Sequence, residues 1–377
     1  MTRLALVNAR IALPVGLRDG LCVLVEDGRI AGVSSGIPAN AEIVDLGGGT
    51  LVPGFIDTQV NGGGGRLFND DPSVETIRVI AETHRRFGTT GLLPTIISDD
   101  LTVVEAAIRA TDQAIEAGVP GVLGLHIEGP FLDPARRGIH DGAKLRRLED
   151  SFLELLASAK HGRTLVTLSP ESATPDQVSW LTKQGVIVAA GHSDAPYDTV
   201  RAMIDAGITG FTHLFNAMSQ LVNRAPGMVG AALEDDATYA GLIVDGHHLH
   251  PATVRIAVRA KGPQRLMLVT DAMPSVGTDD PEFVLQGRRI RREGDKLLGE
   301  DGVIAGSTLT MDAAVRQVLA QTGIPFADAL AMASATPAHF LGLQAETGAI
   351  TPGLRADLVL LDADLAVRQS WIGGISN

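Results

Sequence analysis

Eight short apolar runs recur along the middle of this chain, and segments with helical periodicity fill most of the gaps between them. The runs are Gly54–Val60, Gly91–Ile97, Val122–Ile127, Thr164–Leu168, Val186–Ala190, Gly210–Thr212, Ala240–Val244 and Arg265–Thr270. The helical segments include Val74–Phe87, Thr102–Ala117, Pro175–Gln184, Tyr197–Ala206 and Pro251–Ala260. Short strands that alternate with helices are typical of a parallel sheet covered by helices. Eight such units predict an α/β fold, a (β/α)8 TIM-like barrel.

The same units could instead form an open, doubly wound sheet. Sheets of that kind that bind dinucleotides carry a GxGxxG turn after their first strand. No such turn follows Gly54–Val60, which weakens the dinucleotide-binding version.

Both ends of the chain are rich in short β-like runs separated by Gly, Pro, Asn and Asp. The runs are Leu4–Val7, Leu21–Glu26, Arg29–Val33 and Glu42–Asp45 at the beginning, and Ala349–Ile350, Asp357–Asp362 and Ala366–Arg368 at the end. We therefore expect a small β-sandwich domain built from residues 1–52 and 345–377, beside a barrel of residues 53–344. Within the barrel segment, Phe283–Ile304 is polar and charged and predicts an inserted hairpin.

Composition excludes several classes of partner. A net charge of −13 with 4% aromatic residues offers neither the basic face nor the stacking surface that nucleic-acid binding requires. No apolar run approaches the roughly 18 residues of a membrane span, and no basic amphipathic stretch suits a membrane surface. The single cysteine, Cys22, cannot form an internal disulfide, and no signal peptide is apparent. We expect a cytoplasmic protein with no membrane or nucleic-acid partner.

Ionisable side chains gather at the ends of the predicted strands, where barrel enzymes place their active sites. They are Asp57, His126, Glu128, His192, Asp194, His213, Asp245, His247, His248 and Asp271. Glu128, His192 and His213 come from three different strands and form a His₂Glu set of the kind that binds catalytic metals. Such a set leaves a coordination position for water, whose pKa a bound metal lowers towards neutrality.

Asp271 ends the eighth predicted strand. Its carboxylate could take a proton from the water and pass it to a leaving amine, which describes hydrolysis of an amide or a related bond. Other readings exist, because Asp271 could be a helix N-cap and a single histidine at a strand end is usually a packing or capping residue. Two such histidines together with a glutamate favour metal binding.

Six segments carry a resemblance that covers essentially the whole chain, in order. They are Pro53–Asp57 (PGFID), Leu125–Phe131 (LHIEGPF), Gly191–Asp194 (GHSD), Thr212–Met218 (THLFNAM), Val269–Ala272 (VTDA) and Ala305–Ser307 (AGS). The chain resembles the N-acetylglucosamine-6-phosphate deacetylases, a family of the amidohydrolase superfamily. HxEGPF and THLFNAM are the specific segments, whereas PGFID alone indicates only the superfamily.

The resemblance implies an activity and a set of catalytic roles. The reaction is the removal of acetate from N-acetylglucosamine 6-phosphate to give glucosamine 6-phosphate, in amino-sugar catabolism and recycling. Glu128, His192 and His213 would bind the metal, and Asp271 would be the general base and acid. His140 matches a histidine that contacts the substrate and polarises the acetyl carbonyl.

The resemblance also implies a phosphate site and a dimer. Asn216 and Ala217 match a backbone contact to the phosphate, Arg224 matches a phosphate-binding arginine, and His248 matches a second contact to the sugar phosphate. An arginine fork suits a dianionic phosphate. In the family, Arg224 and His248 would reach the site from the neighbouring subunit, which implies a homodimer.

One position departs from the wider superfamily. Many amidohydrolases carry His-x-His after the first strand and hold two metals, whereas this chain has Gln59 and Asn61 there. Amides are poorer ligands than imidazole for a borderline-soft divalent ion. We therefore expect one divalent metal, zinc first, with iron, manganese or cobalt as alternatives. A weak second site at Gln59 and Asn61 stays open.

Three rival functions remain at this stage. The galactosamine epimer differs from the glucosamine substrate at one hydroxyl, and no residue separates the two. A cyclic-amide hydrolase of the same superfamily would need no phosphate site. A non-catalytic sugar-phosphate binding protein would need neither Asp271 nor the metal ligands, so their presence speaks against it.

Overall fold

The computed structural model describes residues 3–377, and its centre is a sheet of eight parallel strands. The strands are β8 (Phe55–Val60), β11 (Thr89–Ile97), β12 (Gly124–Glu128), β13 (Arg163–Leu168), β14 (Ile187–Ala190), β15 (Gly210–Phe211), β16 (Tyr239–Leu242) and β17 (Leu266–Leu268). They neighbour one another in chain order from β8 to β17, and each overlaps one of the eight predicted runs.

Hydrogen bonds between the end of β8 and the residues that follow β17 close this sheet into a barrel. The backbone N–H of Asp271 donates to the carbonyl of Gln59 at 3.0 Å, and Asn61 donates likewise to Ala272 at 2.9 Å. Further into the barrel, the hydroxyl of Thr270 lies 2.5 Å from the carboxylate of Asp57. The open, doubly wound alternative is therefore wrong, and the predicted barrel is confirmed.

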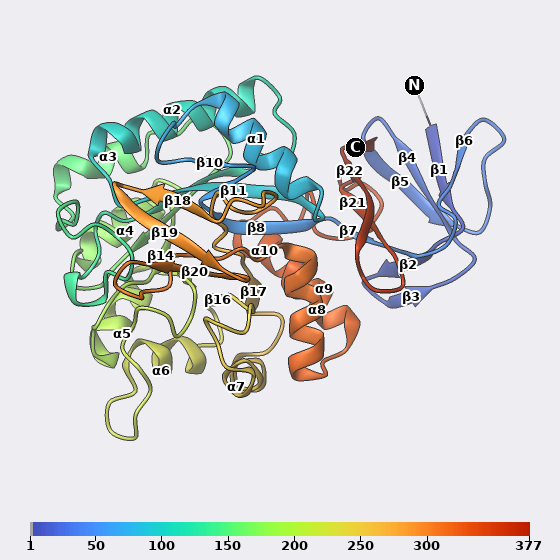
Figure 1. Ribbon diagram of the computed structural model, residues 1–377. Coiled ribbons are helices and arrows are strands. Elements are labelled where there is room, and N and C mark those ends of the chain that lie inside the picture. Colours follow the sequence, from blue (N-terminus) through green and yellow to red (C-terminus); the bar gives the residue numbers. More distant parts are fainter. Residues whose placement is uncertain (1–2) are drawn as a thin grey trace.

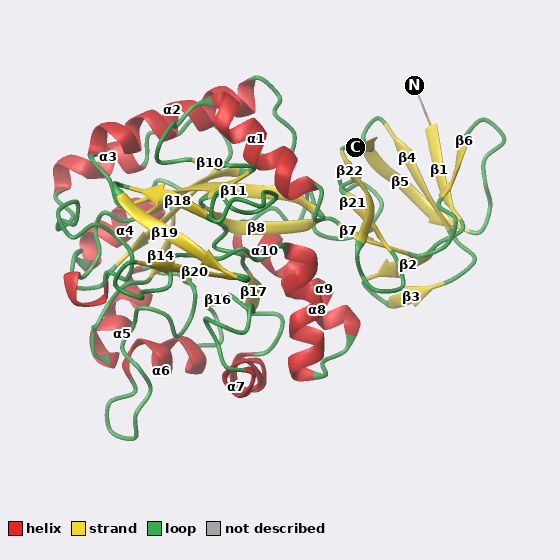
Figure 2. Ribbon diagram, in the orientation of Figure 1, coloured by secondary structure: helices red, strands yellow, loops and turns green. Residues whose placement is uncertain are grey.

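Helices surround the barrel on its outside (Figure 2). They are α1 (Val74–Arg85), α2 (Leu101–Glu116), α3 (Leu153–Leu156), α4 (Pro175–Lys183), α5 (Tyr197–Ala206), α6 (Gly227–Glu234), α7 (Pro251–Lys261), α8 (Met311–Thr322), α9 (Phe326–Ala333) and α10 (Ala335–Phe340). Helix α1 is an example of how the sequence forms these helices. The side chain of Ser73 caps its N-terminus by accepting a hydrogen bond from the backbone N–H of Thr76. Ile77, Ile80 and Ala81 bury one face of the helix against the barrel.

Two further sheets form a β-sandwich beside the barrel, at the right of Figure 1, where both chain ends lie. The four-stranded sheet has the order β5 (Arg29–Ser34), β4 (Cys22–Glu26), β1 (Arg3–Val7) and β6 (Glu42–Asp45). The six-stranded sheet has the order β23 (Ile375–Ser376), β22 (Val367–Ile372), β21 (Leu358–Leu361), β7 (Thr50–Pro53), β2 (Arg10–Leu13) and β3 (Gly16–Arg18).

The sandwich is assembled from both ends of the chain, as predicted. Strand β7 pairs antiparallel with β21, and Val23, Leu51, Leu358 and Trp371 share one apolar core. The predicted run Ala349–Ile350 forms no strand, because Ile350 packs into this core from a connecting segment. The predicted domain boundaries remain predictions.

Two smaller sheets lie in loops of the barrel. A short hairpin, β9 (Gly62–Gly63) with β10 (Arg66–Leu67), follows β8. The predicted insertion is confirmed as a three-stranded antiparallel sheet of β18 (Glu282–Leu285), β19 (Arg288–Glu293) and β20 (Lys296–Gly299). Among the helices within residues 3–377, none has the length and apolar character needed to cross a bilayer.

Candidate active site

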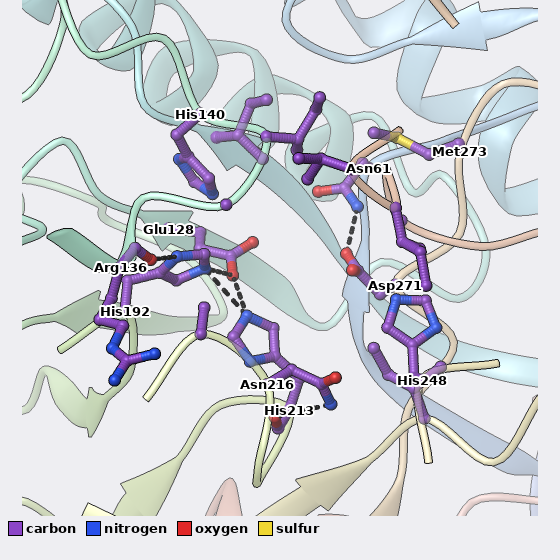
Figure 3. A pocket seen from close by; sticks show the side chains of 18 of the residues that line it. Asn61, Glu128, Arg136, His140, His192, His213, Asn216, His248, Asp271 and Met273 are labelled. Atoms are coloured by element: carbon purple, nitrogen blue, oxygen red, sulfur yellow. Dashed lines mark hydrogen bonds and ion pairs between the residues drawn. The ribbon is translucent and has the colours of Figure 1, made fainter. Parts of the chain in front are cut away.

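A cavity of about 400 Å³ opens at the carboxyl ends of the barrel strands (Figure 3). The predicted residues that line it are Glu128, His140, His192, His213, Asn216, Ala217, His248 and Asp271. Asp57 and His126 lie deeper: Asp57 bonds to Thr270, and His126 Nε2 lies 2.8 Å from the hydroxyl of Thr167. The strand ends thus bring most of the predicted site together.

The three predicted metal ligands converge on one point. His192 Nε2 and His213 Nε2 lie 3.3 Å and 3.1 Å from the same carboxylate oxygen of Glu128, and 2.9 Å from each other. All three side chains are buried, with exposed fractions of 2% to 4%. Burial of a carboxylate between two imidazole nitrogens is costly unless the three groups share a charge or an ion.

This cluster fits a metal ion. Bonds of about 2.0–2.2 Å to a tetrahedral ion separate its ligand atoms by roughly 3.3–3.6 Å, close to the spacings seen here. His192 Nδ1 lies 2.9 Å from the carbonyl of Arg136, which accepts its hydrogen and leaves the Nε2 lone pair free. The donor set of two imidazoles and one carboxylate suits a catalytic metal of intermediate softness.

His140 could complete a different cluster, because its ring also lies within 4.8 Å of Glu128 and His192. Its hydrogen bonds argue against that role. The backbone N–H of Ser98 donates to His140 Nδ1 at 3.3 Å, and the Ser98 hydroxyl lies 2.7 Å from the same nitrogen. Nδ1 is therefore the acceptor, so the hydrogen is on Nε2 and no lone pair there faces the ion. Burial and, secondly, His192 lower the pKa of His140 to about 3, which keeps this ring neutral.

Asp271 occupies the opposite wall of the cavity (Figure 3). Asn61 Nδ2 donates to its Oδ1 at 2.6 Å, and Gln59 Nε2 donates to the same oxygen at 3.3 Å. Burial and, secondly, the charge of Glu128 raise the pKa of Asp271 to about 6. A carboxylate with such a pKa can both accept and return a proton near neutral pH.

Gln59 and Asn61 donate hydrogen bonds to the carboxylates of the site, and Asn61 Oδ1 is buried with no hydrogen-bond partner. Gln59 Nε2 donates to both carboxylate oxygens of Glu128, at 3.0 Å and 3.1 Å, as well as to Asp271. Two amide groups thus stabilise the carboxylates of Glu128 and Asp271. The number of metal ions stays a prediction.

The residues predicted to bind phosphate divide into two groups. Asn216, Ala217 and His248 line the cavity, and Asp245 orients His248 through a 2.6 Å contact to Nδ1. The loop after β16 carries His248 into the cavity of its own chain, and its contribution to the site of a neighbouring subunit stays a prediction. Arg224 is exposed on the loop before α6 and does not line that cavity.

Comparison with known proteins gives the family. The model of the amidohydrolase family matches residues 50–375. The chain belongs to the amidohydrolase family. It is 45% identical over 371 residues to N-acetylgalactosamine-6-phosphate deacetylase of Shewanella sp. (strain ANA-3), covering 97% of this chain and 94% of the relative. It is 37% identical over 369 residues to the protein of the same name from Escherichia coli O157:H7, covering 97% of each.

Among solved structures, N-acetylglucosamine-6-phosphate deacetylase from Pasteurella multocida superimposes with a TM-score of 0.96. It is 33% identical and covers 100% of this chain and 99% of that one. This amidohydrolase is accordingly a metal-dependent hydrolase, and the glutamate and histidine cluster is where it could hold its metal.

Several lining residues of the amidohydrolase cavity had no sequence signal that we used. They are Ile97, Arg136, Ile139, Met273, Val303 and Ile304, whereas His247 and Gly306, which also line the cavity, lie at a predicted strand end and in the AGS segment. Arg136 is the most consequential, since its carbonyl orients His192 while its guanidinium pairs with Asp194 at 2.7 Å. The AGS segment that includes Gly306 contributed to the resemblance and could have indicated that this loop reaches the site.

Backbone strain also marks this amidohydrolase site. Of nine non-glycine residues with positive φ within residues 3–377, five lie at the strand ends around the cavity. They are His192 (49°), His213 (32°), Phe215 (78°), Ala217 (49°) and Asp271 (51°). Such conformations cost free energy and are held by the surrounding structure, as is common where side chains must be aimed at one point.

Proposed function

We propose that this amidohydrolase removes acetate from N-acetylglucosamine 6-phosphate and releases glucosamine 6-phosphate. The observation that carries the proposal is the meeting of the Glu128, His192 and His213 donor atoms within 2.9 to 3.3 Å, in a cavity shared with Asp271 and His140. The full-length similarity to N-acetylglucosamine-6-phosphate deacetylases supports the choice of substrate.

Each catalytic side chain has a distinct task in this proposal. A divalent ion at Glu128, His192 and His213 would supply Lewis acidity and lower the pKa of a water towards neutrality. Asp271 would accept a proton from the attacking water and deliver it to the amide nitrogen. The water oxygen bonds to the acetyl carbon while the C–N bond breaks, so acetate and a free amine leave. His140 donates its Nε2 hydrogen to the carbonyl oxygen as negative charge develops there.

The phosphate anchors the substrate at the opposite end of the cavity. The backbone at Asn216 and Ala217 and the imidazole of His248 would contact it, and binding energy there positions the distant acetamide. Arg224 would add a charged fork from a second copy of the chain. Its loop suits an interface, because Leu221 and Val222 beside it are each 54% exposed. We therefore propose a homodimer.

The identity of the ion and the compartment belong to the same proposal. Zinc is the first choice for a His₂Glu set, and iron, manganese and cobalt accept the same ligands. Cys22 is buried and unpaired, which suits a reducing cytoplasm.

N-acetylgalactosamine 6-phosphate is the second candidate substrate. Relatives at 45% and 37% identity over nearly the whole chain carry that substrate in their names. Because the epimers differ at one hydroxyl, a ratio of kcat/KM values for the two substrates decides between them. A ratio above about tenfold, or 1.4 kcal/mol, in favour of the galactosamine epimer would replace the main assignment.

Acetate release tests the proposal directly. The purified protein is chelated, reloaded separately with Zn²⁺, Fe²⁺, Mn²⁺ or Co²⁺, and supplied with N-acetylglucosamine 6-phosphate. We expect stoichiometric acetate and glucosamine 6-phosphate from at least one metal form and none from the chelated protein. If every metal form binds the sugar phosphate without releasing acetate, the protein is a sensor and not a deacetylase.

A further inference from the structure

The inserted sheet β18–β20 packs against the wall of the active-site cavity, yet no predicted site residue lies on it. Leu285, Ile290 and Leu297 are buried in one apolar cluster with Ile97 and Met273. Ile97 and Met273 in turn line the cavity. The insertion is therefore attached to the catalytic wall by a shared core, and its turns are held in place relative to the site.

The turn between β18 and β19 has an unusual residue for its geometry. Leu285 pairs with Arg288, so Gln286 and Gly287 form a two-residue turn with φ of 48° and 80°. Positive φ at both positions defines a type I′ turn, whose first position favours Asn, Asp or Gly. The backbone of a glutamine is strained in this conformation. The contacts of the Gln286 side chain therefore explain its presence better than the turn does.

The side chain of Gln286 reaches the residue that holds His140. Its Nε2 donates to the carbonyl of Ser98 at 2.7 Å and to Asp99 Oδ2 at 3.2 Å. Ser98 contacts His140 Nδ1 through both its backbone N–H and its hydroxyl. The guanidinium of Arg288 donates to the carbonyl of Ile139, the residue directly before His140. The insertion thus holds His140 from two directions.

We propose that Gln286 and Arg288 are positioning residues that keep the imidazole of His140 aimed at the cavity with its hydrogen on Nε2. The catalytic role of His140 in this inference rests on the proposed function. The position of its ring does not, because its contacts are seen in the structure. If the Gln286 contact is lost, Ser98 can shift, Nδ1 loses its fixed donor, and the ring samples the other tautomer or turns away.

The substitution Gln286→Asn separates positioning from stability. Asparagine suits the type I′ turn better than glutamine, but it is one methylene too short to reach Ser98. We expect an unchanged or higher Tm together with a fall in kcat of about tenfold and little change in KM, since a small misplacement of a catalytic group is costly. Val284→Thr is the matched control, because Val284 lies on β18, two residues before Gln286, and is 59% exposed. It should leave kcat and Tm unchanged.

Ring-¹⁵N NMR of histidine-labelled protein provides a readout that needs no substrate. The His140 signals, assigned by their loss in His140→Asn, should show a protonated Nε2 and an acceptor Nδ1 in the native protein and a tautomer mixture in Gln286→Asn. A spectrum and a kcat equal to those of Val284→Thr would overturn the positioning role. A changed spectrum in a protein that releases no acetate would retain the positioning role while rejecting the deacetylase.

Discussion

The two ends of the active-site cavity are built in different ways. At the metal end, Glu128, His192 and His213 lie at the ends of barrel strands and are almost completely buried. At the end where we propose that the phosphate binds, Asn216 and His248 come from loops, and Arg224 lies exposed outside the cavity of its own chain. In our proposal the barrel strand ends place the metal ligands and Asp271, whereas His140 and the recognition of the phosphate depend on loops and, for the phosphate, on a second copy of the chain.

This difference predicts which changes abolish activity and which only weaken binding. A defect at the metal end removes groups that act in the transition state, and it should lower kcat. A defect at the phosphate end removes contacts that are made equally in the ground state and in the transition state. Such a defect should raise KM. The predictions below run from the largest expected effect to the smallest.

Loss of a metal ligand should have the largest effect. We expect His213→Ala to lower kcat by more than about 10⁴-fold, beyond the cost of losing a proton-transfer group alone. Metal analysis should show at the same time that the variant retains far less than one ion per chain. A variant that binds metal normally and keeps its activity would remove His213 from the ligand set.

Asp271→Asn should come next. The amide keeps the shape of the carboxylate but cannot take a proton, so kcat should fall by about 10²–10⁴-fold. KM should change little, and the metal content should stay near that of the native protein. If metal is lost as well, Asp271 belongs to the ligand set instead.

Arg224→Ala should act on binding. Hydrogen bonds to charged groups contribute ~1.5–3 kcal/mol, so KM should rise by about 10- to 100-fold with kcat largely kept. A variant with unchanged kinetics on its best substrate would favour a cyclic-amide hydrolase, which needs no phosphate site.

Mixing two variants that are each impaired at low substrate concentration sharpens the same point. If Arg224 serves the partner's site, co-refolded Asp271→Asn and Arg224→Ala chains form mixed dimers with one intact site. Activity at low substrate should then recover to about a quarter of the native value, as random pairing in a symmetric dimer requires. No recovery, in a sample shown to contain mixed dimers, would place Arg224 in its own chain's site or in neither.

Asp245→Asn should have the smallest effect of this series. Asp245 contacts His248 Nδ1 at 2.6 Å and orients its ring without lying among the cavity residues. One such hydrogen bond contributes about 0.5–1.5 kcal/mol, so its loss should raise KM about 2- to 10-fold. A steady-state assay at several phosphate-ester concentrations measures this, and a larger change in kcat than in KM would assign His248 to the chemistry.

Sequence patterns predicted the barrel, the sandwich and the metal end of the cavity. A parallel barrel brings the carboxyl ends of all its strands to one rim, so Glu128, His192, His213 and Asp271 could be grouped from strand ends alone. The predicted strand Ala349–Ile350 does not form, because burial and strand pattern disagree there. Ile350 lies in a connecting segment and packs into the core of the sandwich.

Contacts between distant residues were decided only by the tertiary structure. Ser98 and His140 are 42 residues apart, and Ser98 and Gln286 are 188 apart, yet these contacts set the tautomer of the imidazole. His248 likewise entered its own chain's cavity, and Asn61 turned its hydrogens towards Asp271. Periodicity and spacing report which face of an element is buried, because that depends on local geometry. The direction of a hydrogen bond depends on which remote group lies opposite, and that is known only once the chain has folded.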